Sequence, residues 1–445
     1  MFKKIKEIIR LAIPAVAEMI LYMLIWVFDT LMVGKSAGQV GVSAVGLSSE
    51  VMYTFLNILI GMGLSISITS LVARALGERN SSKANEFANQ GIKLGVFISF
   101  ALCLIFFIFS KQILKIAGAD DQVLHLGNSY MKICSIGMIF NMWSNLLSGV
   151  YRGCKDTKTP LLGALILNIV NISLDYCLIF GKFGFPQMGV NGAAIATTLG
   201  NIACFALLFY KRKNIPFKIS LKDKFNLRED KELLGLAIPS GLQEAAFSIV
   251  RLLGVMMVMR LGSLAFSANQ IVITIESISF MPGWGFAIAA TALVGHSVGE
   301  KDYKKAREYA NISSFLASAV MGFFALVFLF FAKDLVGMFI KHEEVDVIKL
   351  GATCLMIGAI QQIPMAVDMV LSGALKGAGD SKTPFVIVLI CNWLVRLPLM
   401  WYFIYYKRES IIYFWIITSI QWWLEGIVMT ILYRRKFYKT YVEIQ

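Results

Sequence analysis

The sequence predicts an all-α polytopic membrane protein with 12 transmembrane helices in two six-helix bundles, related by a pseudo-twofold axis along the membrane normal. Of the 445 residues, 57% are hydrophobic and only 16% are charged, whereas soluble proteins carry roughly 25% charged residues. Twelve apolar segments are long enough to cross a bilayer, and the second half of the chain repeats the first. This composition excludes a cytosolic enzyme, a disordered chain and a secreted disulfide scaffold.

Each predicted span has the length that a helix needs to cross a bilayer, about 20 residues. The first apolar run continues through Asp29 without a small-residue cleavage site, so we interpret it as a span and not as a signal peptide. The seven cysteines show no CxxC pairs and mostly lie in apolar stretches, which indicates small hydrophobic side chains. The predicted spans are 8–33, 44–73, 86–110, 126–151, 159–180, 190–210, 233–259, 264–297, 308–332, 347–375, 383–406 and 410–433.

The basic residues predict the orientation, because cytoplasmic loops of membrane proteins are rich in Lys and Arg. With the N-terminus in the cytoplasm, 28 of the 42 Lys and Arg residues fall on the cytoplasmic side and ten on the other side. The net charge of +14 therefore indicates topology and not nucleic-acid binding. We expect a multi-pass protein of the cell (inner) membrane, with both termini in the cytoplasm.

The two halves of the chain repeat each other. Leu11-Ala-Ile-Pro14 recurs as Leu236-Ala-Ile-Pro239, and 147–160 matches 371–384 at nearly the same offset. Six helices per repeat give both halves the same orientation, as in transporters built from parallel repeats. The expected domains are an N-lobe at 1–210, a basic cytoplasmic linker at 211–232 that touches lipid headgroups, a C-lobe at 233–433 and a cytoplasmic tail at 434–445.

Ionisable side chains inside the predicted spans are costly, so we treat them as candidates for function. Asp29 lies in the first span, and Asn171 and Asp175 share one face of the fifth. In the sixth span, a run of small residues adds the Thr197 hydroxyl and a backbone carbonyl at Ala193. If these helices meet, their oxygens suit either Na⁺ or a proton held between the carboxylates. The alternative is a static hydrogen-bonded cluster that only fixes helix packing.

The second half also carries ionisable residues within its spans, and their role is more open. They are Glu244, Glu276, Asp368, Arg251 and Arg396. We expect Glu276 and Arg396 to pair across the bundle, because a buried charge needs a partner of the opposite sign. Glu18, Glu50 and Glu425 lie nearer to helix ends, where we expect their carboxylates to extend to the membrane surface.

Five motifs stand out in the sequence: the repeated Leu-Ala-Ile-Pro start, Phe28-Asp-Thr-Leu-Met-Val-Gly34, Glu276-Ser-Ile-Ser-Phe-Met-Pro282, Asn392-Trp-Leu-Val-Arg-Leu-Pro398, and the repeated Gly-x-x-Asp-(Thr/Ser)-Lys-Thr-Pro. Together they resemble the MATE family of multidrug and toxic compound extrusion transporters. The resemblance covers essentially the whole chain. It implies secondary-active efflux of lipophilic organic cations by alternating access, with Na⁺ or H⁺ as the coupling ion and no other cofactor.

The resemblance also implies roles for single residues of the first half. Cation-coupled MATE transporters are similar in having an Asp on the first helix, an Asn and an Asp four residues apart on the fifth, and a Thr on the sixth. Asp29, Asn171, Asp175 and Thr197 match these positions. In the family, bending of the first helix has been proposed to accompany protonation, which makes Pro14 a possible hinge. The alternative for Pro14 is a proline near a helix start with no mechanical role.

In the second half the resemblance is less direct. MATE members of the NorM type are similar in carrying a Glu on the seventh helix and an Asp on the tenth, both of which bind the coupling cation. Glu244 and Asp368 each lie about one helical turn from those positions. Flexible Met and aromatic side chains in a cleft would suit varied flat cations. The candidates are Met19, Tyr22, Tyr53, Met138, Phe140, Met256, Met257, Met281 and Trp284, and for any single one core packing is the favoured interpretation.

Two other functions fit the sequence less well. The nearest alternative is a lipid-linked oligosaccharide flippase of the same superfamily. Such flippases have more spans and a cationic cleft, and Arg251 and Arg396 keep this alternative open because they could line such a cleft. An intramembrane enzyme is disfavoured because the chain has three histidines and no HExxH, Gly-x-Ser-x-Gly or P-loop motif. As partners we expect small organic cations and membrane lipids but no nucleic acid, and we expect a monomer.

Overall fold

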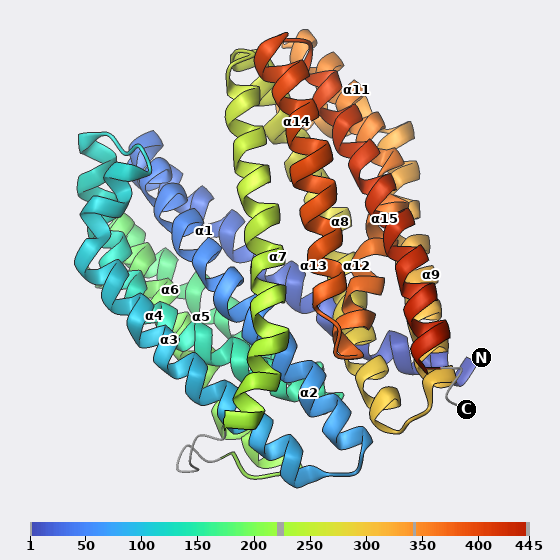
Figure 1. Ribbon diagram of the computed structural model, residues 1–445. Coiled ribbons are helices and arrows are strands. Elements are labelled where there is room, and N and C mark those ends of the chain that lie inside the picture. Colours follow the sequence, from blue (N-terminus) through green and yellow to red (C-terminus); the bar gives the residue numbers. More distant parts are fainter. Residues whose placement is uncertain (1, 220–226, 341–343, 442–445) are drawn as a thin grey trace. The chain divides into compact units, whose positions relative to one another are not determined.

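The computed structural model describes residues 2–219, 227–340 and 344–441, so the middle of the predicted linker and the end of the predicted tail lie outside the described residues. The described chain is helical and contains no strand (Figure 1). Its elements are α1 (Phe2–Leu56), η1 (Asn57–Ser65), α2 (Ile66–Gly77), α3 (Ser81–Ile116), α4 (Asp121–Gly153), α5 (Lys158–Phe180), α6 (Val190–Lys211), η2 (Arg212–Asn214), α7 (Leu227–Met259), α8 (Ser263–Gly299), α9 (Tyr303–Phe330), α10 (Ala332–Gly337), α11 (Val345–Ile360), α12 (Gln362–Gly377), α13 (Lys382–Leu389), η3 (Ile390–Arg396), α14 (Leu397–Met400), η4 (Trp401–Tyr406) and α15 (Ile411–Tyr441).

These helices contain all twelve predicted spans. Ten helical stretches of the described chain are long and apolar enough to cross a membrane, and the bent pair α11 and α12 adds an eleventh. The stretch Phe2–Gly77 has 76 residues, whereas about 20 residues cross a bilayer. Its backbone breaks at Gly38, where φ is 60°, a conformation that glycine adopts readily. This stretch therefore holds the first two predicted spans.

The tenth predicted span is broken. α11 and α12 meet at a bend of 47°, and Pro364 in the first turn of α12 lacks the N–H that would continue the helical hydrogen bonds. The side-chain amide of Gln362 donates to the carbonyl oxygen of Gly358 at 3.1 Å. The bend leaves the polar side chains of Gln361 and Gln362 inside the bundle, where both are buried.

The repeated Asp-(Thr/Ser)-Lys-Thr-Pro motif begins a helix in each repeat. Asp156 Oδ1 accepts a hydrogen bond from the backbone N–H of Thr159 at 3.0 Å, and Asp380 Oδ1 accepts one from Thr383 at 3.1 Å. Such bonds satisfy N-terminal amides that have no partner within the helix. Burial by itself raises the pKa of Asp380, but hydrogen bonds from Lys436 and Thr383 outweigh it and hold that pKa below its ordinary value.

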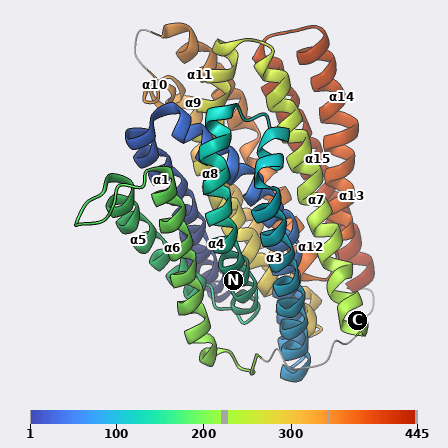
Figure 2. The same cartoon turned by 90° about the vertical axis from the view of Figure 1, so that its left-hand side faces the viewer.

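The chain divides into two compact units. Unit 1 comprises Met1–Val16 and Leu242–Gln445, and unit 2 comprises Ala17–Gly241. In unit 2, α3, α4, α5 and α6 run side by side, as α8, α9, α12 and α15 do in unit 1 (Figures 1 and 2). The limits of the units fall inside α1 and α7, shortly after Pro14 and Pro239. These limits stand at equivalent positions of the two repeats, so each repeat begins with a segment that belongs to the unit formed mainly by the other repeat.

The two exchanged segments, 2–16 and 227–241, use equivalent residues. Three apolar residues of each segment are buried in the core of the unit that the segment joins. They are Ile8, Leu11 and Ala12 in unit 1 and, at the same positions of the second repeat, Leu233, Leu236 and Ala237 in unit 2. The hydrophobic effect therefore fixes both segments by the same face of the helix.

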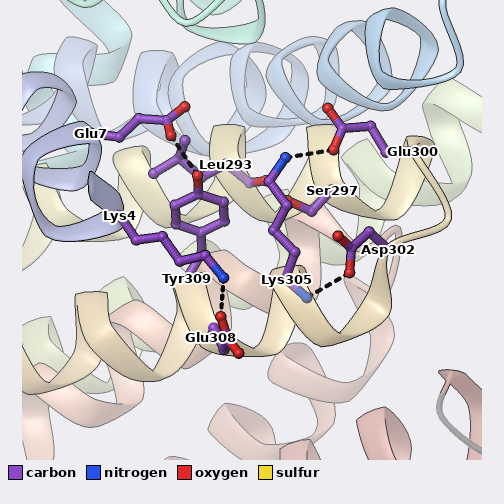
Figure 3. A network of polar contacts seen from close by, with 9 residues as sticks. All are labelled: Lys4, Glu7, Leu293, Ser297, Glu300, Asp302, Lys305, Glu308 and Tyr309. Carbon is purple, nitrogen blue, oxygen red and sulfur yellow. Dashed lines mark hydrogen bonds and ion pairs between the residues drawn. The ribbon is translucent and has the colours of Figure 1, made fainter. Parts of the chain in front are cut away.

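Polar contacts add to this packing. In unit 1, Lys4 forms an ion pair with Glu308, and the Tyr309 hydroxyl donates a hydrogen bond to Glu7 (Figure 3). Lys4 and Glu7 lie near the start of α1, and Glu308 and Tyr309 lie near the start of α9. In unit 2, the counterpart of Glu7 is Glu232, whose Oε1 lies 3.4 Å from the guanidinium of Arg74. Each exchanged segment thus carries an acid that binds the unit it joins.

Glycines allow the exchanged segments to approach their neighbours closely. A Cβ added at Gly285 in α8 would lie 2.8 Å from the backbone nitrogen of Val16 and 2.3 Å from its side chain. In the other unit, a Cβ at Gly63 would lie 3.4 Å from the carbonyl oxygen of Ala237. The backbone contact at Gly285 is the tighter of the two and cannot be relieved by turning a side chain.

Gly285→Ala tests the packing of the first segment. We expect it to destabilise the protein by about 1–3 kcal/mol, since the new methyl group overlaps a backbone atom in a packed core. Gly235→Ala is the matched control, because its new methyl group would meet nothing within 4 Å and alanine favours a helix over glycine. Thermal unfolding in detergent measures both variants. Equal losses in the two would contradict the close contact at Val16.

Candidate functional site

The four polar residues predicted for the N-lobe meet inside unit 2. Asp29 comes from α1, Asn171 and Asp175 come from α5, and Thr197 comes from α6. Their exposed fractions are only 6%, 0%, 0% and 7%. The side-chain amide of Asn171 donates to Thr197 Oγ1, and this hydroxyl donates to Asp29 Oδ2, each over 3.3 Å. Asp29 and Asp175 lie within hydrogen-bond reach of each other.

The local sequence explains why these helices meet. Asn168, one turn before Asn171 on α5, donates to the carbonyl oxygen of Leu21 on α1 at 3.1 Å. Gly200 on α6 packs against the α5 backbone, since a Cβ there would lie 3.1 Å from the carbonyl oxygen of Leu167. Ala193, the predicted source of a carbonyl, is fully buried in the same core. Small residues on α6 thus let α5 approach closely and bring its polar face to α1.

We call the cluster of Asp29, Asn171, Asp175 and Thr197 the acid site. Most of its polar atoms are oxygens, and several of these have no hydrogen-bond donor within the described chain. They are Asp29 Oδ1, Asn171 Oδ1 and both carboxylate oxygens of Asp175. The side chains that act on the two carboxyl groups are Asn171, Thr197 and each other, none of which is a cation. Two neighbouring carboxylates away from water cannot both carry a charge without a cation or a proton between them. The site is therefore suited to hold a proton or a small hard cation.

A pocket adjoins the acid site and shares Thr197 with it; the space of about 360 Å³ between its walls includes open solvent. Its lining includes Tyr53 and Met138, two of the side chains predicted to face a cleft, and the hydroxyl-bearing residues Ser49 and Tyr130. The hydroxyl oxygens of Ser49 and Tyr130 lie 3.1 Å apart. The pocket thus combines aromatic and sulfur-bearing walls with a few hydrogen-bonding groups, as is typical of small-molecule sites.

Two residues of this pocket, Asn141 and Asn201, were not singled out from the sequence. Asn201 donates to the backbone carbonyl of Thr197 at 2.9 Å, and Asn141 donates to Asn201 Oδ1 at 2.8 Å. Asn145 in turn donates to Asn141 Oδ1 at 2.9 Å. The spacing of four residues between Thr197 and Asn201, and between Asn141 and Asn145, was the signal, because it places each pair on one face of an apolar helix.

In unit 1, the acids of the second half lie beside basic residues. Glu244 and Asp368 both act electrostatically on Lys376, which is buried on α12 with Asp368. Arg251, more exposed on α7, also acts on Glu244. Asp368 Oδ1 has no hydrogen-bond partner among the described residues. The structure thus brings Glu244 and Asp368 to one place, and it adds a lysine ammonium that the acid site of unit 2 lacks.

Glu276 and Arg396 belong to a second polar cluster of unit 1. Glu276 Oε1 accepts hydrogen bonds from the side-chain amides of Gln361 and Gln362, at 2.5 and 2.9 Å. The charges of Glu425 and Glu276 both act electrostatically on Arg396, and Glu425 has the stronger influence. The charge of Glu276 is therefore stabilised chiefly by amides, and the predicted direct pair of Glu276 with Arg396 stays a prediction.

The expectation that Glu18 and Glu425 extend to the membrane surface is wrong, since their exposed fractions are 0% and 1%. Glu18 Oε1 binds the guanidinium of Arg152 at 2.7 Å, and Glu425 accepts a hydrogen bond from Asn392. Glu50 is exposed, as expected. Distance from a helix end did not predict burial, because partners on other helices, remote in the sequence, decide it.

The Glu18–Arg152 pair has a counterpart in the other repeat. Arg152 and Lys376 stand at equivalent positions of the repeated motif. Both bases are buried. Arg152 binds Glu18, and Glu244 acts electrostatically on Lys376; each acid follows the exchanged segment shortly, within the same unit as its base. In both repeats an acid shortly after the limit between the units thus acts on a buried base of the repeated motif.

Comparisons with known proteins agree with the repeat and the fold. A family model described as MatE matches residues 14–177 and 239–402, so the same pattern occurs once in each half of the chain. The chain is 29% identical over 423 residues to a "Probable multidrug resistance protein NorM" of Thermotoga maritima, covering 92% of this chain and 88% of the relative. It is 26% identical over 427 residues to an "Uncharacterized transporter YisQ" of Bacillus subtilis, covering 95% and 92%.

Solved structures match the fold closely. A transporter of the MOP superfamily from Pyrococcus furiosus superposes with a TM-score of 0.89 at 21% identity, over 98% of this chain and 96% of that one. A multidrug resistance MATE family transporter in an outward-facing conformation gives the same TM-score, identity and coverage. At this level of identity the superpositions establish the helical fold.

Replacing Arg152 tests the buried ion pair. We expect Arg152→Met to destabilise the protein by about 3–5 kcal/mol, because Glu18 would keep a buried charge without a partner. The double variant Glu18→Gln with Arg152→Met should recover much of the loss, because both charges are then gone. Thermal unfolding of the wild type, both single variants and the double variant measures the coupling. Additive losses would argue against the pair.

Proposed function

The chain belongs to the MatE family of multidrug efflux transporters, and we propose that it exports lipophilic organic cations in exchange for Na⁺ or H⁺ by alternating access. The family model matches both halves, and members of this family are transporters, not enzymes. The observation that carries the proposal is the acid site of unit 2, where Asp29 and Asp175 lie together, buried and without a cationic partner among the described residues.

We place the coupling ion at this acid site. A proton or Na⁺ between the two carboxyl groups would complete the hydrogen bonding of oxygens that otherwise lack a donor in the described chain. Thr197 supports this assignment, because it contacts Asp29 and also lines the neighbouring pocket. An ion that binds Asp29 and Asp175 can in this way alter the pocket in which a substrate would lie.

The acids of unit 1 are weaker candidates for coupling. Glu244 and Asp368 lie beside Lys376, whose ammonium already supplies a positive charge. Glu276 receives hydrogen bonds from two glutamine amides. A mobile cation at these acids would have to compete with an ammonium or with amide donors, whereas Asp29 Oδ1 and both carboxylate oxygens of Asp175 have no donor within the described chain.

Membrane voltage contributes to such an exchange only through the net charge that moves inward. Each net positive charge gains about 2.3 kcal/mol per 100 mV, so voltage helps when more charge enters with the coupling ions than leaves with the organic cation, and otherwise the concentration gradient of the coupling ion supplies the energy. The proposed direction of exchange assumes that both termini lie in the cytoplasm. The 28 basic residues predicted for the cytoplasmic side favour this orientation. We propose that the protein works as a monomer in the cell membrane, and that Tyr53 and the neighbouring Met side chains receive the organic cation.

The flippase alternative is not favoured. The MatE model matches 14–177 and 239–402, and several relatives bear the name multidrug resistance protein. Arg396, one of the two arginines that kept this alternative open, is buried and lies under the electrostatic influence of Glu425. Its charge is therefore compensated within the protein and is not available to a pyrophosphate group.

Efflux of ethidium from proteoliposomes with imposed Na⁺ or H⁺ gradients tests the proposal. We expect Asp29→Asn and Asp175→Asn each to reduce gradient-driven transport at least tenfold, because either change removes one of the two charges that attract the ion. Asp121→Asn is the matched control, since it removes an exposed carboxylate at the start of α4 and should leave transport unchanged.

The gradient that drives efflux identifies the coupling ion. If the well-folded wild type moved no organic cation, the export function would be refuted. Transport that persisted in both acid variants would leave export intact and would move the coupling site away from Asp29 and Asp175, toward Glu244, Glu276 or Asp368.

A further inference from the structure

A groove at the end of α6 lies apart from the acid site. The space along it is about 720 Å³, is open to the outside and includes open solvent. Its wall is formed by Ile202, Phe205, Ala206 and Phe209, whose spacing of three and four residues places them on one face of the helix. The groove therefore runs along the helix axis, in the direction in which lipid chains lie beside a membrane-spanning helix.

Aromatic packing holds this wall in place. The ring of Phe205 lies 5.2 Å from that of Trp143 and 5.9 Å from that of Phe140, both on α4. The ring of Phe209 follows at 5.6 Å from Phe205. Because α4 supports these rings from behind, the groove keeps its shape without an occupant.

Two basic residues stand at the end of the groove. The guanidinium carbon of Arg212 lies 3.5 Å from the centre of the Phe209 ring, and Lys213 Nζ lies 5.9 Å from the centre of the Tyr210 ring. Stacking on a ring leaves the edge of a guanidinium free to donate hydrogen bonds. Yet Arg212 Nη1 is buried and has no hydrogen-bond partner within the described part of the chain, so this nitrogen lacks an acceptor there.

We propose that this groove binds an anionic phospholipid, with the headgroup phosphate at Arg212 and Lys213 and an acyl chain along the face of α6. Guanidinium groups bind phosphate through paired hydrogen bonds, which would satisfy Arg212. The residues that line the groove include no acid that could neutralise the two basic side chains. An apolar wall that continues directly from the basic end suits a lipid and offers nothing to a free phosphate ion.

This site does not depend on the proposed transport function. It uses α4, α6 and η2, and none of its residues belongs to the acid site. The lipid would hold the end of α6, the helix that carries Thr197, at a fixed depth in the membrane. Binding can be measured without a gradient or a transported compound, so its failure and the failure of efflux are separate results.

Native mass spectrometry of the purified protein, titrated with dioleoyl phosphatidylglycerol, tests the proposal. We expect the double variant Arg212→Gln with Lys213→Gln to bind this lipid on the order of tenfold more weakly, since each basic residue near a membrane surface contributes to anionic lipid binding. The matched control is Arg434→Gln with Arg435→Gln. It removes the same charge from exposed residues near the end of α15, the last helix of the second repeat.

Further measurements distinguish a specific lipid site from nonspecific electrostatic attraction between anionic lipids and basic residues. Dioleoyl phosphatidylcholine should bind more weakly than phosphatidylglycerol to the wild type, and inorganic phosphate should not displace the lipid. Phe209→Leu, which keeps the apolar wall but removes the ring beneath Arg212, should weaken phosphatidylglycerol binding as well. Equal losses in both charge variants, or displacement of the lipid by phosphate, would overturn the proposal. Unfolding temperatures without added lipid show whether each variant is folded.

Discussion

The burial of two carboxyl groups at one point is the constraint around which unit 2 is organised. Asp29 and Asp175 come from helices far apart in the sequence, and small residues on α6 let those helices meet. Each carboxylate would be far more stable in water. A proton or an ion between the acids would offset this cost. Unit 1 stabilises its buried acids differently, with Lys376, Arg396 and glutamine amides that are part of the chain.

The internal repeat explains how the same arrangement of helices accommodates both ways of stabilising acids. Arg152 and Lys376 are buried at equivalent positions; Arg152 binds Glu18, and Glu244 acts electrostatically on Lys376, so each repeat sets a buried base against an acid that follows the exchanged segment. These pairs add little to stability compared with apolar side chains of similar volume, but a single charge left alone would be costly. They therefore favour one register between the first and fourth helices of each repeat.

The sequence predicted best those features that are written along one helix or copied between the repeats. Apolar length predicted the spans, and the spacing of Asn171 and Asp175 predicted the polar face of α5 that reaches Thr197. Prediction from the sequence failed for residues whose partners lie on helices far away along the chain. Glu18 finds Arg152 on a distant helix, and Glu276 finds Gln361 only because of the bend before Pro364. The limits between the units were also unpredicted, since periodicity identifies a helix but not the bundle in which each half of it packs.

The exchanged segments affect the order in which the chain can fold during synthesis. Segment 2–16 emerges from the ribosome long before its core partners on α8 and α9, which are made only after the first repeat and α7. Unit 2, in turn, lacks part of its core until 227–241 has been inserted. Neither repeat can therefore complete a unit from its own residues alone, and segment 2–16 must wait for its partners with an apolar face uncovered by protein.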